Sequence, residues 1–156
     1  ENWNQWRIKN IDIEPNLSKA DLRETQLQKE DLSRTNLNEA KLQFSNLTGA
    51  NLKNTSLEKA KFQAANLQSA NFKNADLSGV GMLETNLQNA NLENTNLEGA
   101  QFSEDTLFNQ TNLQGANLKA TTGLSSSQIN LVITDKQTML LDYLEEEMDD
   151  DFLLKM

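Results

Sequence analysis

Large apolar residues recur at every fifth position along most of the chain. The series keeps one phase from Leu17 to Leu107, which makes nineteen consecutive positions occupied by Leu, Phe or Met. A one-residue insertion is expected around residues 108–110, after which Leu113 and Leu118 complete 21 units. A short period sustained over so many units predicts a solenoid rather than a conventional globular core.

Neither an α-helix nor a set of long strands can use a period of five. Five residues advance about 500° around a helix axis, so successive leucines would point to every side of the helix. In a long strand the side chains alternate, and every second leucine would leave the core. Short extended segments joined by corners fit the period instead.

Each unit therefore consists of one short side and one corner. A small residue, mostly Ala, Ser or Thr, stands two positions before each large one, and Asn or Asp usually lies between them. In an extended segment the small and large residues point to one side and the Asn to the other. The last two residues turn the corner, where Gly49, Gly79, Gly99 and Gly115 suit a positive φ.

Four such sides predict a square coil that closes after four units. Of the four large positions that are not Leu, three recur at intervals of four units, namely Phe62, Met82 and Phe102, and a triangular coil of three units would scatter them over different faces. At about 4.8 Å per coil, about five coils make an all-β solenoid roughly 24 Å long. Outward amides one coil apart should stack as ladders. One such series is Asn51, Asn71 and Asn91.

The units have the composition of a known repeat. ANLKN at residues 50–54, ANFKN at 70–74 and ANLEN at 90–94 closely resemble the A-(N/D)-L-x-x consensus of the pentapeptide-repeat family, over about two thirds of the chain. This resemblance implies a right-handed quadrilateral β-helix, which the spacing alone reaches only in part. Residues 120–128 and 135–138 also resemble the closing segment of many cyanobacterial members.

The two ends of an open stack need covers, because they expose unpaired backbone and an apolar mouth. Three regions are therefore predicted: an N-terminal cap with a short helix at residues 1–14, the β-helix at 15–120, and a helical cap with an acidic tail at 121–156. The N-terminal helix is indicated by the spacing of its apolar residues. These are Trp3 and Trp6, followed by Ile8, Ile11 and Ile13.

The C-terminal region predicts two helical segments. Ser125 and Gln128 fit a capping box for a short helix that closes the second mouth. That helix should carry Ile129, Val132 and Ile133.

From Leu140 onward the pattern is that of an acidic amphipathic helix. Its apolar stripe is Leu141, Leu144, Met148 and Phe152. The stripe can pack on the rod, on a second copy in a homo-oligomer, or in the groove of a partner protein.

One face of the rod departs from the repeat. There the usual outward Asn or Asp is replaced by Lys41, Lys61 and Gly81, and Phe44 and Leu83 are expected to be exposed nearby. Such residues mark a contact surface or are isolated surface hydrophobics. With the tail, the candidate interaction surface comprises Phe44, Leu83, Leu141, Leu144, Met148 and Phe152.

The residue inventory excludes most catalytic chemistry. The chain has no Cys and no His, so it lacks thiolate and imidazole groups. Glu30 and Asp105 stand at inward positions where an unpaired carboxylate is costly. We interpret Asp105 as a companion of the insertion and Glu30 as tilted outward. Because roughly four coils separate them, we predict no enzyme and no catalytic, cofactor-binding or metal site.

Charge distribution narrows the partners. The formal net charge is -9, yet residues 1–120 carry 15 acids and 12 bases, whereas residues 121–156 carry 8 acids and 2 bases. Dispersed bases do not predict direct nucleic acid binding. The chain contains no apolar run of about 18 residues, so we predict no membrane partner. A partner, if any, should be another protein.

Two functions follow from these observations. The first is a non-enzymatic structural or protein-interaction module. The alternative, implied by the family resemblance, is a DNA-mimicking modulator of a topoisomerase such as gyrase, although the weak net charge of the repeats, -3, argues against it. We expect a cytoplasmic location, or the periplasm or thylakoid lumen if an export signal has been removed.

Overall fold

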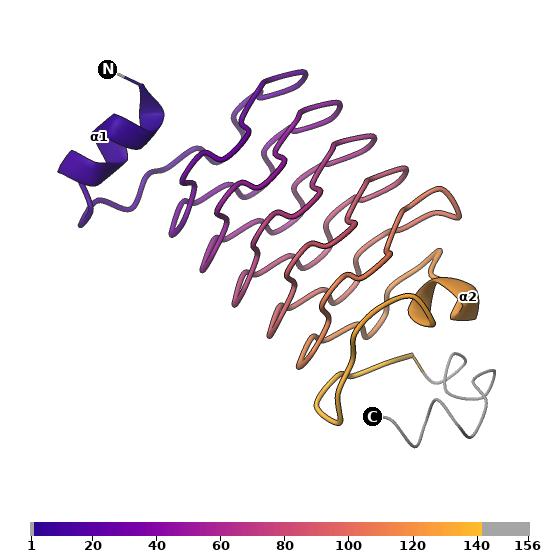
Figure 1. The fold of residues 1–156 in the computed structure, drawn as a ribbon. Helices are drawn as coiled ribbons and strands as arrows, with labels where there is room; N and C mark the ends of the chain where they lie inside the picture. Colours follow the sequence, from indigo (N-terminus) through magenta and orange to yellow (C-terminus); the bar gives the residue numbers. More distant parts are fainter. Residues whose placement is uncertain (1, 142–156) are drawn as a thin grey trace.

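A rod of stacked, four-sided coils forms the body of the protein (Figure 1). The structure is a computed structural model that describes residues 2–141. Isolated parallel β-bridges join each outward residue to its counterpart four units later, from Asn16 and Asn36 to Gly81 and Gln101. Four sides per coil are therefore confirmed. The helices of the described chain are α1 (Trp3–Lys9) and α2 (Ser126–Ile129), at opposite ends of the rod.

Backbone hydrogen bonds hold each coil to the next. The amide of Leu52 donates to the carbonyl of Asn71 at 2.7 Å, and the amide of Asn71 donates back to Ala50 at 2.9 Å. At the corner, the amide of Asn54 donates to Lys73 at 3.1 Å. Since every unit repeats this pattern, most backbone groups of the coils find partners without forming strands longer than one bridge residue.

The small and large residues of each unit fill the rod. The inward large side chains from Leu32 onward are buried, and Phe62 and Phe72 meet edge to face at 6.2 Å between ring centroids. Where Thr takes the small position, its hydroxyl can bond a core carbonyl, as Thr55 does to Leu52 at 2.7 Å. A polar residue can thus enter the core without an unpaired group.

Outward Asn and Asp residues hold the corners as well as the ladders. The Oδ1 atom of Asn71 accepts from the amide of Lys73, and that of Asn91 accepts from Glu93. The predicted series Asn51, Asn71 and Asn91 lies in register, because successive members form β-bridges. In this series the side-chain amide of Asn51 donates a hydrogen bond to Asp31 Oδ1 at 2.9 Å. A short acceptor two residues before an unpaired amide explains why Asn and Asp dominate this position.

The second corner residue of each unit adopts a positive φ. Gly49, Gly79, Gly99 and Gly115 do so, as predicted. Sixteen non-glycine residues between positions 2 and 141 share this conformation, including Phe44. The left-handed region costs a non-glycine residue roughly 1 to 2 kcal/mol. The ladder therefore dictates the corner geometry even where the residue does not favour it.

The insertion lies earlier than predicted. A six-residue unit with an enlarged corner at residues 103–105 places Thr106 and Phe108 inside. Leu107 is the outward residue, 44% exposed, and bridges to Asn86 of the coil before it. Asp105 is exposed, so its inward assignment was wrong. Phe108 packs edge to face on Phe102, with 5.1 Å between the ring centroids. This contact explains why Phe108, and not Leu107, points inward.

Helix α1 docks on the first coil through polar groups. Asn2 and Gln5 form a capping box at its start. The indole of Trp3 donates to Asp31 O at 2.6 Å, and Asn4 Oδ1 accepts from Asp31 N at 2.7 Å. These bonds pair the backbone of the first coil at a point where no preceding coil can.

The isoleucines expected in the N-terminal cap are not buried. Ile8 is 77% exposed, and Ile11 and Ile13 are also exposed. Arg7 is buried in their place, at 1% exposure, and its guanidinium donates to the carbonyls of Ile13 and Ser33. Three and four residue spacings put Trp3, Trp6 and Arg7 beside one another, which turns Ile8 to the outside.

The first coil also buries part of an acid. Glu30 is half-buried and its Oε2 atom is buried without a hydrogen-bond partner, so its outward assignment was wrong. Leu17, Leu22 and Leu27 of the same coil are only partly buried. The incomplete cover over this coil explains how a carboxyl group can occupy a position normally taken by Ala.

Helix α2 has the predicted capping box. Ser125 accepts from the amide of Gln128, whose side chain caps the helix in return. The same Gln128 side chain donates to Ser103 O and Thr106 O, both at 2.9 Å, and so satisfies carbonyls of the enlarged corner. The helix ends at Ile129, which is buried, whereas Ile133 lies beyond it, exposed, and bridges to Asn112.

Replacing a central leucine should unfold the rod. Leu67→Asp would bury an unpaired carboxylate and remove a side chain that is fully buried, at a cost of at least about 3 kcal/mol. We expect thermal denaturation followed by circular dichroism to show a large fall in Tm or no cooperative transition. Ser69→Asp, on the exposed corner of the same unit, is the control. An unchanged Tm for Leu67→Asp would contradict the buried assignment.

Two glycines with the same sign of φ should differ in tolerance. A Cβ at Gly123 would overlap the carbonyl oxygen of Phe102, whereas the nearest atoms to a Cβ at Gly99 are 4.0 Å away. Gly99→Ala should cost about 1 kcal/mol from its conformation alone, and Gly123→Ala clearly more. Urea denaturation of both variants checks this order. Equal losses would mean that the backbone at Phe102 yields readily.

Candidate functional site

One of the four outward ladders breaks the amide pattern of the others. We call it the lysine face, and from the first coil downward it consists of Asp21, Lys41, Lys61, Gly81, Gln101 and Thr122. Lys41 and Lys61 form a direct bridge, so two like charges stand on adjacent rungs. Like charges in opposed positions destabilise a sheet. The two adjacent lysines therefore do not stabilise the fold, and this face is a candidate binding surface.

Further lysines lie along the corner beside this face. Lys19 and Lys59 join Lys41 and Lys61 around an open groove of about 390 Å³, which Glu39 also lines. Their acidic neighbours are exposed: Glu39 Oε1 lies 3.8 Å from Lys19 Nζ, and Glu58 Oε1 lies 3.1 Å from Lys59 Nζ. Exposed pairs of this kind contribute little energy.

The two ladder lysines themselves form no ion pair with any other described residue. Among residues 2–141, no carboxylate lies within 4.0 Å of the ammonium group of Lys41 or Lys61. Asp21, one rung above Lys41, is held by Arg23, whose Nε and Nη2 atoms donate to its two oxygens at 2.8 and 2.7 Å. Within residues 2–141, the groove therefore contains two cations, Lys41 and Lys61, that form no ion pair.

Arg23 also controls the ionisation of Asp21. Its hydrogen bonds lower the pKa of Asp21 from 3.8 to about 2, with a smaller contribution from the charge of Lys41. At physiological pH this carboxylate is ionised and bound to Arg23. The upper end of the lysine face is thus locally neutral, and the excess positive charge lies on the rungs below it.

A notch lies directly beneath the lysines, and its lining includes Gln43, Gln63 and Gln101. A Cβ at Gly81 would have no atom within 4 Å, and a groove of about 190 Å³ opens there beside Lys61 and Leu83. Phe44 is 60% exposed and Leu83 is 37% exposed, as predicted. Backbone bonds link them through the coil between, Phe44 to Gln63 and Ala64 to Leu83. Both therefore lie along one corner of the lysine face; their role in binding stays a prediction.

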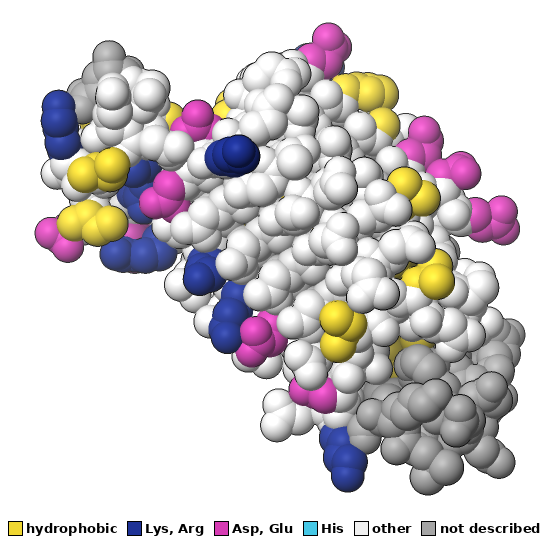
Figure 2. Space-filling view, in the orientation of Figure 1, with side chains coloured by type: hydrophobic (Ala, Val, Ile, Leu, Met, Phe, Trp, Pro, Cys, Tyr) yellow, Lys and Arg dark blue, Asp and Glu magenta, His cyan; other side chains and the backbone are white. Residues whose placement is uncertain are grey.

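Charge is divided unevenly along the rod. Residues 2–75 contain 11 bases and 8 acids, net +3, whereas residues 76–141 contain 2 bases and 7 acids, net -5. In Figure 2 the charged side chains lie along the edges of the visible face, and its middle is largely uncharged. The lysine face thus belongs to a positive half of an otherwise acidic molecule.

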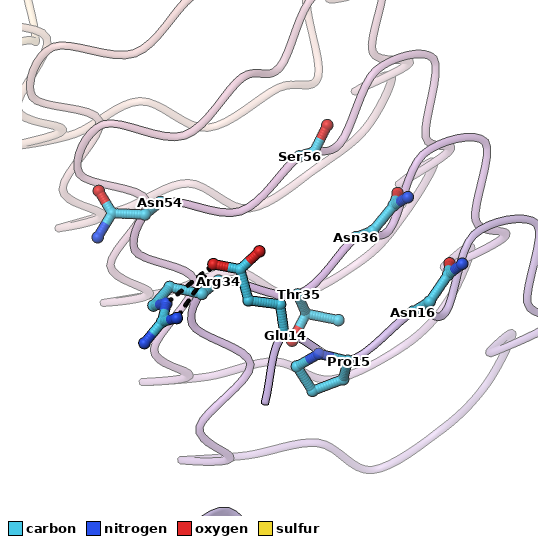
Figure 3. A pocket seen from close by; sticks show the side chains of 8 residues that line it. All are labelled: Glu14, Pro15, Asn16, Arg34, Thr35, Asn36, Asn54 and Ser56. Carbon is cyan, nitrogen blue, oxygen red and sulfur yellow. Dashed lines mark hydrogen bonds and ion pairs between the residues drawn. The ribbon is translucent and has the colours of Figure 1, made fainter. Parts of the chain in front are cut away.

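A third groove lies at another corner and has no net charge. It measures about 540 Å³ and is lined by Glu14, Pro15, Asn16, Arg34, Thr35, Asn36, Asn54 and Ser56 (Figure 3). Arg34 is already bound, to Glu14 at 3.0 Å and to the carbonyl of Ile11. Because its cation is occupied and its other groups are small amides and hydroxyls, this groove offers less binding energy than the lysine face.

Of the six residues predicted as an interaction surface, the structure brings two together. Phe44 and Leu83 share the lysine face, while Leu141 lies at the far end of the rod, partly buried beside Leu140 and a groove with Lys119. The remaining three, Leu144, Met148 and Phe152, lie outside the described residues, as does most of the predicted acidic helix. Sequence reasoning missed Lys19 and Lys59, whose spacing of two coils could have placed them on one corner.

Other chemistry is not assembled in the described part of the chain. Residues 2–141 contain no cluster of three acidic side chains able to hold a metal ion. Within the same span, no helix is long and apolar enough to cross a membrane.

Comparison with known proteins identifies the family. The family model described as pentapeptide repeats matches residues 16–54, 45–80 and 83–122, in eight copies. The chain belongs to the pentapeptide-repeat family, whose fold is a right-handed quadrilateral β-helix and whose members are generally non-catalytic. No curated protein matches the sequence.

Solved structures agree with this assignment. A pentapeptide repeat protein from the thylakoid lumen of Arabidopsis thaliana is 28% identical, with a TM-score of 0.71, over 81% of this chain and 92% of that one. The protein Rfr23 from the cyanobacterium Cyanothece is 25% identical, with a TM-score of 0.56, over 88% of this chain and 97% of that one. The pentapeptide repeat fold thus extends over nearly the whole length of both structures.

Removing Arg23 should release Asp21. In Arg23→Gln we expect the pKa of Asp21 to rise from about 2 toward 3.8, because the hydrogen bonds to its carboxylate are lost. A pKa depressed in the folded state stabilises the protein above the ordinary pKa, and this contribution is lost as the pH falls through the folded value. Carboxyl chemical shifts in an NMR titration measure the change, with Lys53→Gln as control. An unmoved midpoint would show that Arg23 does not bind Asp21.

Proposed function

We propose that this protein is a non-enzymatic docking module, and that its lysine face binds a protein segment carrying acidic and apolar side chains. The observation that carries the proposal is that Lys41 and Lys61 lie on adjacent rungs above the notch at Gly81 and form no ion pair within residues 2–141. Cations without partners bind carboxylates without first breaking an ion pair. Phe44 and Leu83 offer apolar contact at the same edge.

The rigidity of the rod supports docking. The units of the face from Lys41 to Gln101 are bonded through their backbone to the coils above and below, so little conformational entropy is lost when a partner binds. The two grooves on the face, about 390 and 190 Å³, are open troughs. They suit side chains of an extended or helical segment rather than an enclosed small molecule.

Imitation of DNA is the weaker alternative. A DNA mimic must present an acidic surface along its length, whereas residues 2–75 have excess positive charge. The fluoroquinolone resistance protein QnrB1 is 17% identical, with a TM-score of 0.43, over 86% of this chain and 84% of that one, a likeness that bears no argument on function.

The remaining parts have supporting roles in this proposal. We propose that α1 and the region around α2 are caps on a body of about five coils, with boundaries near residues 15 and 120. The bonds of Trp3 and Asn4 to the backbone of Asp31 in the first coil, and of Gln128 to the carbonyl of Ser103 in the enlarged corner, support this division. For the compartment we retain the cytoplasm as the first proposal; the luminal Arabidopsis structure supports the alternative of an exported chain.

Capture with matched variants tests the docking surface. The bait is the full chain and Lys41→Gln/Lys61→Gln, in which Gln is a residue already found on outward rungs at Gln26 and Gln101. Lys29→Gln/Lys53→Gln removes the same charge from other corners and serves as control. Each bait is also prepared with Glu145, Glu146, Glu147, Asp149, Asp150 and Asp151 changed to amides, because the tail is itself a candidate docking segment.

We expect specific proteins to be retained by the parent and control baits and lost with Lys41→Gln/Lys61→Gln. Retention should weaken at about 0.5 M salt, because charge interactions are screened there. Identical retention by both double variants would refute docking at the lysine face. Tighter binding of a short DNA duplex than of any protein would assign the same cations to nucleic acid instead.

A further inference from the structure

We propose that the acidic C-terminal segment, residues 142–156, folds back along its own rod and occupies the lysine face. This inference rests on the proposed function of that face as a docking surface. It names the first occupant of the surface and makes the chain self-blocking, so that an external partner must displace the segment.

Charge complementarity selects this occupant. Residues 142–156 contain seven acids and one base, net -6. The segment follows the half of the rod with net charge -5 and is attracted by the half with net charge +3. The two fields act in the same direction, because the first repels the segment from the coils nearest to it and the second attracts it toward Lys61 and Lys41.

The segment starts at the correct corner. Leu140 is buried, and Leu141 lines a groove with Lys119 and Ala120. The amide of Gly99 donates to Lys119, and the amide of Lys59 donates to Ser78, which together place this exit in the corner column of Lys59. That column borders the lysine face. The chain therefore leaves the rod beside the surface that it is proposed to cover.

The segment is long enough. Three rungs separate Lys61 from Thr122 on the lysine face, and the exit is one rung lower. Lys61 lies four rungs from the exit and Lys41 five, about 19 and 24 Å. The acids of the segment end at Asp151, and residues 142–151 span about 15 Å as a helix but up to about 33 Å when extended. An extended segment therefore reaches both lysines. A tethered segment has a local concentration in the millimolar range, which favours its own rod over a second copy.

The apolar residues of the segment have a place on the same surface. Leu144, Met148 and Phe152 are four residues apart, and even spacings would put them on one side of an extended segment. The notch at Gly81, with Leu83 at its edge and Phe44 one coil beyond Ala64, is the apolar part of the lysine face. The acidic residues between the stripe positions would then lie toward the lysines. Five of the six residues of the predicted interaction surface would thus meet in one contact, and Leu141 would lie where the segment leaves the rod.

Fluorescence energy transfer within the full chain tests the contact. Because the chain has no Cys, two labels can be placed by Ser18→Cys, at the top of the corner, and Lys155→Cys, near the C-terminus. We expect strong transfer in the parent. The transfer efficiency should fall by at least about twofold under three conditions: in Lys41→Gln/Lys61→Gln, in the six-amide tail variant, and in 1 M salt. At that salt concentration the screening length is about 3 Å. Lys29→Gln/Lys53→Gln should retain the transfer.

Each other outcome has a definite meaning. Transfer that is unaffected by either set of charge changes, while circular dichroism shows intact folding, overturns the inference. Transfer that depends on protein concentration when singly labelled chains are mixed assigns the segment to a second copy and also overturns it. Loss of partner capture with unchanged transfer would leave the docking function standing alone, whereas charge-dependent transfer without any captured partner would support the self-contact and not the docking function.

Discussion

The hydrogen-bonded ladder between coils, with its offset of four units, is the constraint on which the rest of the structure depends. It fixes the length of each side, because one bridge residue must lie above its counterpart. It also forces the second corner residue to a positive φ, even at Phe44 and Lys59. Tight stacking then leaves an interior that is occupied mainly by Leu, Ala, Thr and Phe side chains. Stability thus comes from repetition of one small unit rather than from a large core.

Because the fold depends on one small repeated unit, many outward positions can vary in residue type. The fold requires the small and large inward residues and favours Asn or Asp on the rung between them. The two corner residues of each unit are unconstrained in chemistry, as Lys19, Glu39 and Gly79 on one corner illustrate. Positions that break the rung preference without a structural gain therefore carry information about function. Lys41, Lys61 and Gly81 are such positions, and they are adjacent.

The sequence predicted those features that depend on the repeat alone. The period of five, the square coil, the corner glycines and the Ser125 capping box follow from local chemistry, and the structure contains each of them. The position of the insertion could not be predicted in the same way, because Leu107 and Phe108 are adjacent and both are apolar. Only the packing of Phe108 on Phe102 distinguishes the two phases.

At the N-terminal cap the sequence was misleading for a related reason. Apolar spacing assigned Ile8, Ile11 and Ile13 to the interior, but the first coil presents unpaired carbonyls that require donors. Arg7 donates to the carbonyl of Ser33 and Trp3 to that of Asp31, while the second guanidinium bond of Arg7 goes to Ile13 of the cap itself. Hydrogen-bond demand at the end of a ladder outweighs hydrophobicity there. The candidate site was only partly visible for a similar reason, since Lys19 and Lys59 become neighbours only through the two-coil spacing.

A solenoid of this kind has few means of regulation through shape. Its coils are linked rung by rung, so one surface cannot open without breaking ladder bonds on both sides. Control of a docking surface must then come from what occupies it. Free energy for such occupancy is already stored in the unequal charge of the two halves and in the unpaired lysines, because both lower their energy when an acidic segment approaches. Repulsion between Lys41 and Lys61, a cost to the folded rod alone, becomes a source of affinity once a carboxylate lies between them.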